Sequence, residues 1–145
     1  MCVSGLSLRK VSEQIIEYNK LTTVKFDEKD VCNSYGKTGL VYKDGLFTNM
    51  TKKRVVFSIS SYVSWKLGEE SRGRFGLHLT TDRQNVSETS LSFSTSPATF
   101  PIKLSSSVST SLCPGDSIRV EVINLSKDEV PLYLDNGYVS IVRLN

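Results

Sequence analysis

Apolar and polar residues alternate in several segments of the chain, and the longest alternation predicts a strand between Arg54 and Lys66. Its apolar positions fall on one face: Val55, Phe57, Ile59, Val63 and Trp65. Because successive side chains of a strand point to opposite faces, this segment predicts one packed face and one wetter face of serine and tyrosine. A second alternation from Phe75 to Thr80 follows a polar loop, and we expect it to pair with the first as an antiparallel hairpin.

Further strands are expected where the alternation returns between turn residues. They are Leu21–Phe26, Gly39–Tyr42, Leu91–Ser94, Ile102–Leu112, Ser117–Asn124, Val130–Leu134 and Tyr138–Leu144. Pro114-Gly115-Asp116 and Asp135-Asn136-Gly137 supply the clearest turns between them. Serine-rich stretches also alternate with apolar residues, so we interpret them as strand faces rather than linkers. The chain is therefore predicted to be an all-β, antiparallel sandwich or barrel of about eight to ten strands.

The first twenty residues show a different spacing. Leu8, Val11 and Ile15 recur at helical intervals with charged residues between them, which predicts a short amphipathic helix or extended arm over residues 1–20. A single domain is then expected over residues 21–145. Two interpretations of the arm stay open. It docks on the core of its own domain, or Leu8, Val11 and Ile15 form an assembly anchor on a neighbouring subunit.

Charge and hydropathy exclude several classes of partner. The chain has 145 residues, with 18 Lys and Arg against 15 Asp and Glu, and no basic block is long enough for a nucleic-acid-binding arm. No apolar run approaches the roughly 18 residues of a membrane span, so membrane insertion is not expected. Residues 1–10 lack the apolar run of a secretory signal, which predicts that the chain stays in the compartment where it is made.

No constellation of catalytic or metal-binding residues can be assembled from the sequence. His78 is the single histidine, and no Gly-x-Ser-x-Gly elbow accompanies it, so we expect a surface or interface histidine and no enzyme activity. Cys2, Cys32 and Cys113 lack zinc-site spacing and are expected to be free thiols, although a bond between Cys32 and Cys113 stays open. The acidic turn residues could supply oxygen ligands for a calcium ion, and this alternative stays open. They lack EF-hand spacing, so ordinary turns are the preferred interpretation and no cofactor is expected.

Two further patterns have a functional and an ordinary interpretation. Lys52-Lys53-Arg54 is a basic cluster that, with other arginines, could bind an anionic glycan or phosphate; the ordinary interpretation is a solvated loop. Three Asn-x-Ser/Thr sequons begin at Asn49, Asn85 and Asn124, and they would matter only in a secreted protein. Glycosylation at Asn49 would therefore favour a secreted ligand.

Three longer segments carry a resemblance. The first is Lys43-Asp44-Gly45-Leu46-Phe47-Thr48-Asn49-Met50-Thr51 followed by the strand Val55–Trp65. The second is Leu112-Cys113-Pro114-Gly115-Asp116 with the alternating strand behind it, and the third is the terminal strand Gly137–Leu144. In this order they resemble the jelly roll of the C1q/TNF superfamily, especially the standalone C1q-like domains of large DNA virus and phage surface proteins. The resemblance covers about Leu21 to Asn145 and implies an antiparallel jelly-roll β-sandwich.

The resemblance also implies a function. Such domains are typically compact homotrimers, and viral versions form spikes, fibre heads or cement. We therefore expect a non-enzymatic, homotrimeric surface or minor capsid component of a virion assembled in the host cytoplasm, which contacts capsid proteins or a host receptor or glycan. The alternative is a soluble C1q/TNF-like ligand or carbohydrate-binding module, secreted if a signal peptide was removed. A collagen-like stalk is absent from the sequence, which disfavours a secreted C1q protein.

Candidate contact residues follow from the strand pattern. Large aromatic side chains on an outer strand face must be covered, either by the same chain or by a second subunit. The trimer-interface candidates are Tyr62, Tyr133 and Tyr138. Two polar loops are the candidates for partner binding, through Glu69, Glu70, Arg72, Lys127 and Asp128.

Overall fold

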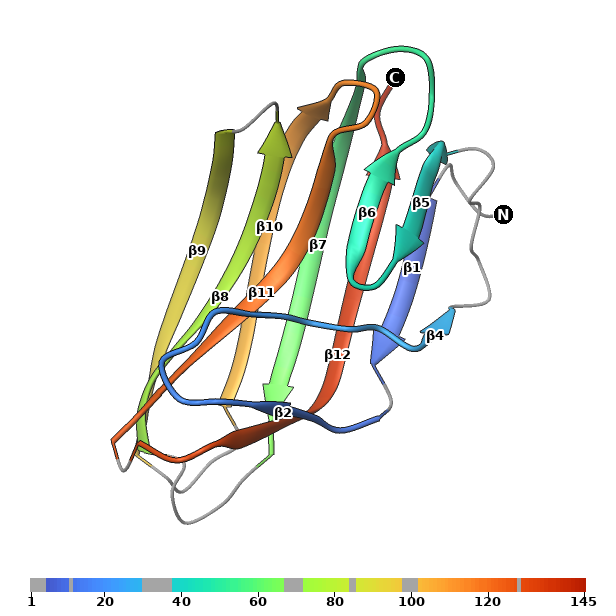
Figure 1. The fold of residues 1–145 in the computed structure, drawn as a ribbon. Helices are drawn as coiled ribbons and strands as arrows, with labels where there is room; N and C mark the ends of the chain where they lie inside the picture. Colours follow the sequence, from blue (N-terminus) through green and yellow to red (C-terminus); the bar gives the residue numbers. More distant parts are fainter. Residues whose placement is uncertain are drawn as a thin grey trace.

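Two antiparallel sheets face each other in the computed structural model, which describes residues 5–10, 12–29, 38–66, 72–83, 86–97, 102–127 and 129–145 (Figure 1). The first, here the β7 sheet, has the order β10(Ile102–Leu112), β7(Val55–Trp65), β12(Leu132–Arg143), β1(Gly5–Lys10), β4(Glu28–Lys29), with β2(Gln14–Ile16) on β12. The second, here the β11 sheet, has the order β5(Leu40–Lys43), β6(Leu46–Asn49), β11(Ser117–Ser126), β8(Arg72–Arg83), β9(Val86–Pro97), with β3(Thr22–Thr23) on β11. Within the described ranges no helix is long and apolar enough to cross a membrane.

The predicted antiparallel jelly-roll β-sandwich is confirmed. Strands distant in sequence lie side by side, as β1 with β12, β7 with β10 and β6 with β11, which is the crossover pattern of a jelly roll. The inward residues of both sheets form one core that contains Phe57, Ile59 and Leu77, each at most 1% exposed. The apolar face predicted for residues 55–65 is the buried face of β7.

The predicted hairpin between residues 54–66 and 75–80 is wrong. β7 pairs with β10 and β12, whereas β8 pairs with β9 and β11, so the two strands belong to different sheets. Their apolar faces meet across the core, where the rings of Trp65 and Phe75 lie 5.2 Å apart. Two sequential strands with the same alternation can pair in one sheet or stack face to face, and the alternation alone does not distinguish these arrangements.

Of the two forms predicted for the N-terminal arm, residues 5–10 have the extended one, docked on their own domain, and not the helical one. Gly5–Lys10 forms β1, which lies between β12 and β4, and Leu8 is buried at 3% exposure within its own domain. Leu6, Leu8 and Lys10 point inward with the period of two of a strand, and pairing with β12 overrides the helical spacing. Ile15 is exposed, and Val11 lies outside the described residues. Leu8 therefore belongs to the core rather than to an anchor.

Residues 14–24 connect the two sheets, and we call them the belt. β2 pairs with β12 of the β7 sheet, and β3 pairs with β11 of the β11 sheet (Figure 1). Between them Asn19 N donates to Asn124 O at 2.8 Å, and Gln14 Nε2 donates to Thr23 O at 2.8 Å. The belt therefore ties the early part of the chain to the last two strands.

Two of the three sequons are structural corners. Asn49 and Asn124 are completely buried, and each side-chain amide donates to two backbone carbonyls while its Oδ1 accepts the N–H two residues later. For Asn49 the carbonyls are those of Lys53 and Leu112, at 3.1 and 2.8 Å. This geometry explains the Asn-x-Ser/Thr pattern without glycosylation. The third asparagine, Asn85, lies outside the described residues.

Candidate functional site: the serine–tyrosine face

The outer side of the β7 sheet carries serine and tyrosine in regular rows. Because residues in register share a face, the inward pairing of Ile59 with Ile141 places Ser60 and Ser140 on the outside. The next row outward brings Tyr62 opposite Tyr138. We call this surface the serine–tyrosine face; its members are Ser7, Ser58, Ser60, Tyr62, Ser105, Ser107, Ser109, Tyr138 and Ser140.

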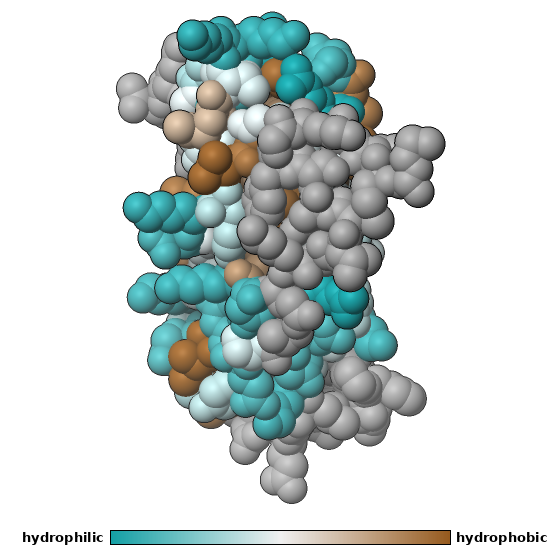
Figure 2. Space-filling model, turned by 90° about the vertical axis from the view of Figure 1, so that its right-hand side faces the viewer, coloured by the Kyte–Doolittle hydropathy of each residue, from teal (hydrophilic) through white to brown (hydrophobic). Residues whose placement is uncertain are grey.

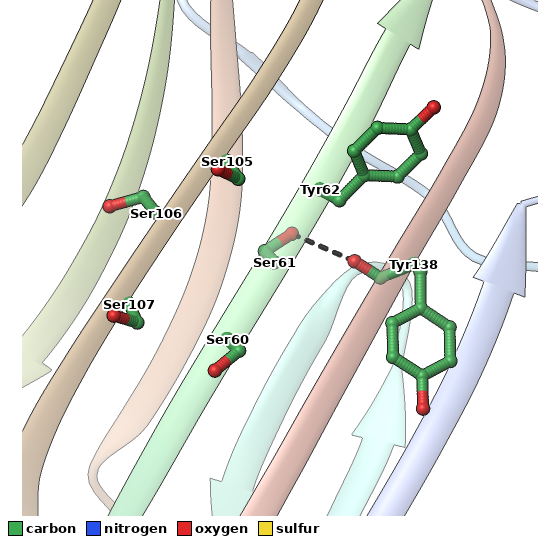
Figure 3. A pocket seen from close by; sticks show the side chains of 7 residues that line it. All are labelled: Ser60, Ser61, Tyr62, Ser105, Ser106, Ser107 and Tyr138. Atoms are coloured by element: carbon green, nitrogen blue, oxygen red, sulfur yellow. Dashed lines mark hydrogen bonds between the residues drawn. The ribbon is translucent and has the colours of Figure 1, made fainter.

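A shallow depression of about 490 Å³ lies in the middle of this face. Figure 3 shows that β7, β10 and β12 supply its lining, with the two tyrosine rings on neighbouring strands and the serine hydroxyls beside them. The lining residues are Ser60, Ser61, Tyr62, Ser105, Ser106, Ser107 and Tyr138. All seven are uncharged, so covering the depression removes hydroxyl and aromatic groups from water but no ion.

Hydrogen bonds fix the tyrosine that borders β1. Ser61 Oγ donates to Tyr138 O at 3.1 Å, drawn as the dashed line in Figure 3. Tyr138 OH donates to Ser7 Oγ at 3.1 Å, which holds the ring against β1. A side chain fixed in the free subunit loses little rotamer freedom when a partner packs on it. The face thus presents Tyr138 in a fixed position on its surface.

The face continues toward the lower end of the sheet in Figure 1. Tyr133 lies in register with Ile15 of β2, and the two side chains are 42% and 46% exposed. The three tyrosines predicted from sequence thus lie on the outer side of one sheet, with Tyr62 and Tyr138 half-buried. Charged residues lie around this surface, with Arg9 and Lys103 exposed beside it and Lys66 paired with Glu13 at 2.7 Å.

The structure gives only part of the predicted partner-binding loops. Glu69, Glu70 and Asp128 lie outside the described residues. Arg72 begins β8, and Lys127 is exposed just after β11. The register of Ser126 with Gly73 places the strand ends that flank both loops at one end of the sandwich. Whether these loops bind a partner stays a prediction.

Sequence reasoning missed the serines of β7 and β10 as site residues. The alternation of serine with apolar residues identified the two serine-rich segments as strand faces. It did not indicate that these two segments would lie in the same sheet. The register aligns Ser105 with Tyr62 and Ser107 with Ser60, which brings two distant serine-rich stretches onto one surface. The signal that could have found them is the shared absence of charge on the polar sides of residues 58–62 and 105–109.

On the other sheet, His78 lies opposite Glu121 in register, and Arg119 Nε is 3.1 Å from Glu121 Oε1. Burial lowers the pKa of His78 below its ordinary value of 6.5, and the charge of Glu121 offsets part of this effect. Among the described residues, no group of three His, Cys, Asp or Glu side chains could hold a metal ion. Cys113 is a free thiol, and Cys2 and Cys32 lie outside the described ranges.

A pH dependence of stability follows from the lowered pKa of His78. The unfolded chain takes up the proton first as the pH falls through 6.5, so stability is complete above this pH and declines toward the lower folded-state pKa. We expect the urea midpoint to fall between about pH 7.5 and 5.5, a range above the titration of most carboxylates. His78→Gln should lose this part of the decline; an unchanged slope would contradict the assignment.

The comparisons with known proteins identify the fold. No model of a known protein family matches the sequence, and no curated protein matches it. Among solved structures, murine APRIL at pH 5.0 is similar with a TM-score of 0.72 and 16% identity, covering 97% of this chain and 98% of that chain. The globular domain of zebrafish complement 1qA protein is similar with a TM-score of 0.64 and 18% identity, covering 97% of this chain and 96% of that chain. The PRD1 vertex protein P5 is similar with a TM-score of 0.69 and 17% identity, covering 100% of this chain and 99% of that chain. The chain therefore has the TNF/C1q-like jelly-roll fold over nearly its whole length.

Proposed function

We propose that this chain is a non-enzymatic assembly protein that forms a homotrimer through the serine–tyrosine face. The observation that carries the proposal is the seven-residue uncharged lining of the depression between β7, β10 and β12. An interface centre depleted of charge and rich in tyrosine, with charged residues around it, is the usual anatomy of a protein contact. The TNF/C1q-like fold supports three subunits as the number, since trimers are what the resemblance implies.

The structure suggests what each part of the face contributes. Tyr62 and Tyr138 supply large rigid surfaces with hydroxyl groups at their tips, which lose little conformational entropy on contact. The serine side chains are short and project little from the sheet, so a partner subunit can approach the strands closely. The pair formed by Tyr133 and Ile15 extends the contact toward the lower end, where half of each side chain is exposed. The face thus combines shape and apolar area with a small desolvation cost.

Charge placed in the centre of this face is the direct test. Light scattering of the purified chain should give a mass near three times 16.1 kDa that persists in high salt. Tyr62→Arg and Tyr138→Arg should each give 16.1 kDa, because three arginines would be buried without partners. Val41→Arg is the matched control, since Val41 is 50% exposed on β5 of the other sheet.

Two results would contradict the trimer. The first is a monomeric wild-type chain at micromolar concentration, and the second is an unchanged mass for both tyrosine variants while their circular dichroism stays native. If Val41→Arg dissociated the assembly instead, the contact would have to be assigned to the β11 sheet.

We further propose that the trimer is a surface component of a virion. The likeness to the PRD1 vertex protein P5 over 100% of this chain supports this role. Antibody labelling of purified virus particles should find the chain on their surface. If particles lack it while the trimer forms in solution, the soluble ligand becomes the better interpretation, which the likeness to APRIL and complement 1qA protein supports.

A further inference from the structure

The loop between β6 and β7 carries three consecutive exposed cations, Lys52, Lys53 and Arg54. Its backbone is held from inside by two side chains. Asn49 Nδ2 donates to Lys53 O at 3.1 Å, Thr51 Oγ1 donates to the same carbonyl at 2.9 Å, and Thr51 N donates to Asn49 Oδ1 at 2.9 Å. The three cations therefore project from a fixed loop, which reduces the entropy lost when they contact a ligand.

A fourth cation lies next to this loop. Gly39 has φ +74°, and the position of its missing Cβ is occupied by the side chain of Thr51, with Arg143 Nη1 4.0 Å from that position. Arg143 also donates from Nε to Asn145 O at 2.6 Å, which keeps its guanidinium at this end of β12. We call Lys52, Lys53, Arg54 and Arg143 the basic end of the sandwich.

Acidic side chains near the loop do not neutralise its three cations. In the part of the chain that the structure describes, Lys52, Lys53 and Arg54 form no ion pair. Asp116 is next to the loop, but it is 7% exposed and its Oδ2 accepts the Cys113 N–H at 2.9 Å. Asp82 lies on β8, with β11 between that strand and β6. The positive charge is thus concentrated on three consecutive exposed cations, with Arg143 beside their loop.

The surroundings favour one class of anion. No exposed aromatic side chain is described at this end, so nucleic acid bases would find no stacking partner. Met50 in the loop and Leu144 next to Arg143 are the exposed apolar residues described beside these cations, and two such side chains are too little apolar area for stable attachment to a membrane. Hydrophilic residues predominate across the upper end in Figure 2, the end where the β6–β7 loop lies in Figure 1. A hydrophilic polyanion fits these features best.

We propose that the basic end binds sulfated polysaccharide chains, through ion pairs between their sulfate groups and the three loop cations, Lys52, Lys53 and Arg54. The site lies at the end of the sandwich and does not use the serine–tyrosine face, so it does not depend on the proposed trimer. Three copies in one trimer would raise the apparent affinity for a long polysaccharide by multivalency.

Heparin is the probe for this site. Binding of the full chain to immobilised heparin at about 0.15 M salt should be measurable, and Lys52→Glu with Lys53→Glu should weaken it at least about tenfold. The matched control is Lys20→Glu with Lys43→Glu, which makes the same charge change at two exposed lysines outside the basic end and should change binding less than about twofold. Unchanged urea midpoints would show that all variants fold, because none of these lysine side chains donates a described hydrogen bond.

Three results would overturn the proposal. One is the absence of heparin binding at this salt concentration. Another is an equal loss in the control variant, which would mean that only net charge matters. The third is tighter binding to phosphatidylserine-containing vesicles or to a single-stranded oligonucleotide than to heparin, which would assign the cations to a membrane or a nucleic acid.

Discussion

Replacing Leu8 by aspartate is expected to abolish folding. Leu8 is 3% exposed in β1, in register with Val139 of β12, so the carboxylate would be buried in the core without a partner. A charge left in such a place costs on the order of 4 kcal/mol or more, a large part of the stability of an ordinary domain. Circular dichroism should show loss of strand signal, and Leu8→Ala should lower the free energy of unfolding by about 2 to 5 kcal/mol.

The control for this prediction is a residue of the same region that faces solvent. Ile15→Asp places the same charge at a side chain that is 46% exposed, and the chain should stay folded whatever happens to its association. If the Leu8 variant kept its native circular dichroism and lost only its assembly, β1 would be a detachable arm and the strand assignment would be wrong.

Replacing Asn49 by alanine is expected to give the second-largest loss of stability. The change removes both donors to the carbonyls of Lys53 and Leu112 and the acceptor of the Thr51 N–H. Each buried polar group left without a partner costs about 1 to 3 kcal/mol, so we expect a loss of about 3 kcal/mol in urea unfolding. Asn49→Asp should be at least as damaging, because it turns the donating group into an acceptor that faces two carbonyls.

Asn136→Ala is the matched control, because Asn136 is exposed and its loss should change stability by less than about 0.5 kcal/mol. A similarly small effect at Asn49 would show that the corner is not held by this amide. The same reasoning means that a glycan at Asn49 is incompatible with the native fold, so glycosylation there does not mark a secreted form of the folded chain.

The sequence predicted the strands well where the alternation was long and failed where tertiary pairing decided the result. The turn expected at Asp135-Asn136-Gly137 is wrong, because β12 runs from Leu132 to Arg143 with only a register shift between Leu134 and Asn136. The bounds of Val55–Trp65 were predicted almost to the residue, because the alternation over this 11-residue segment fits the period of a strand and not that of a helix. Leu8, Val11 and Ile15 suited a helix locally, while a period of two was visible only in Leu6 and Leu8, because the charge of Lys10 hid its inward position. Only the partner strand β12 resolves this choice, and it lies at the far end of the chain.

The candidate site was predictable in composition but not in shape. Tyr62, Tyr133 and Tyr138 were recognised as aromatics on polar faces, and they lie on the outer side of one sheet. Which serines join them depends on the register of β7 with β10, and no local pattern encodes a register between strands separated by some forty residues. The basic cluster at Lys52 was visible in the sequence, whereas Arg143 entered through the fold alone.

The pairing of β1 with β12 has a consequence for how the protein is made. β1 is made before all the strands that separate it from its neighbour β12, and the belt is likewise made well before its partners β11 and β12. Contacts so distant in sequence form slowly, because the chain loses the entropy of closing a long loop before these contacts can stabilise it. During synthesis the half-built sheets expose unpaired strand edges, which can join edges of neighbouring chains. The domain can thus close only once β12 has been made, and correct closure of each subunit competes with aggregation until then.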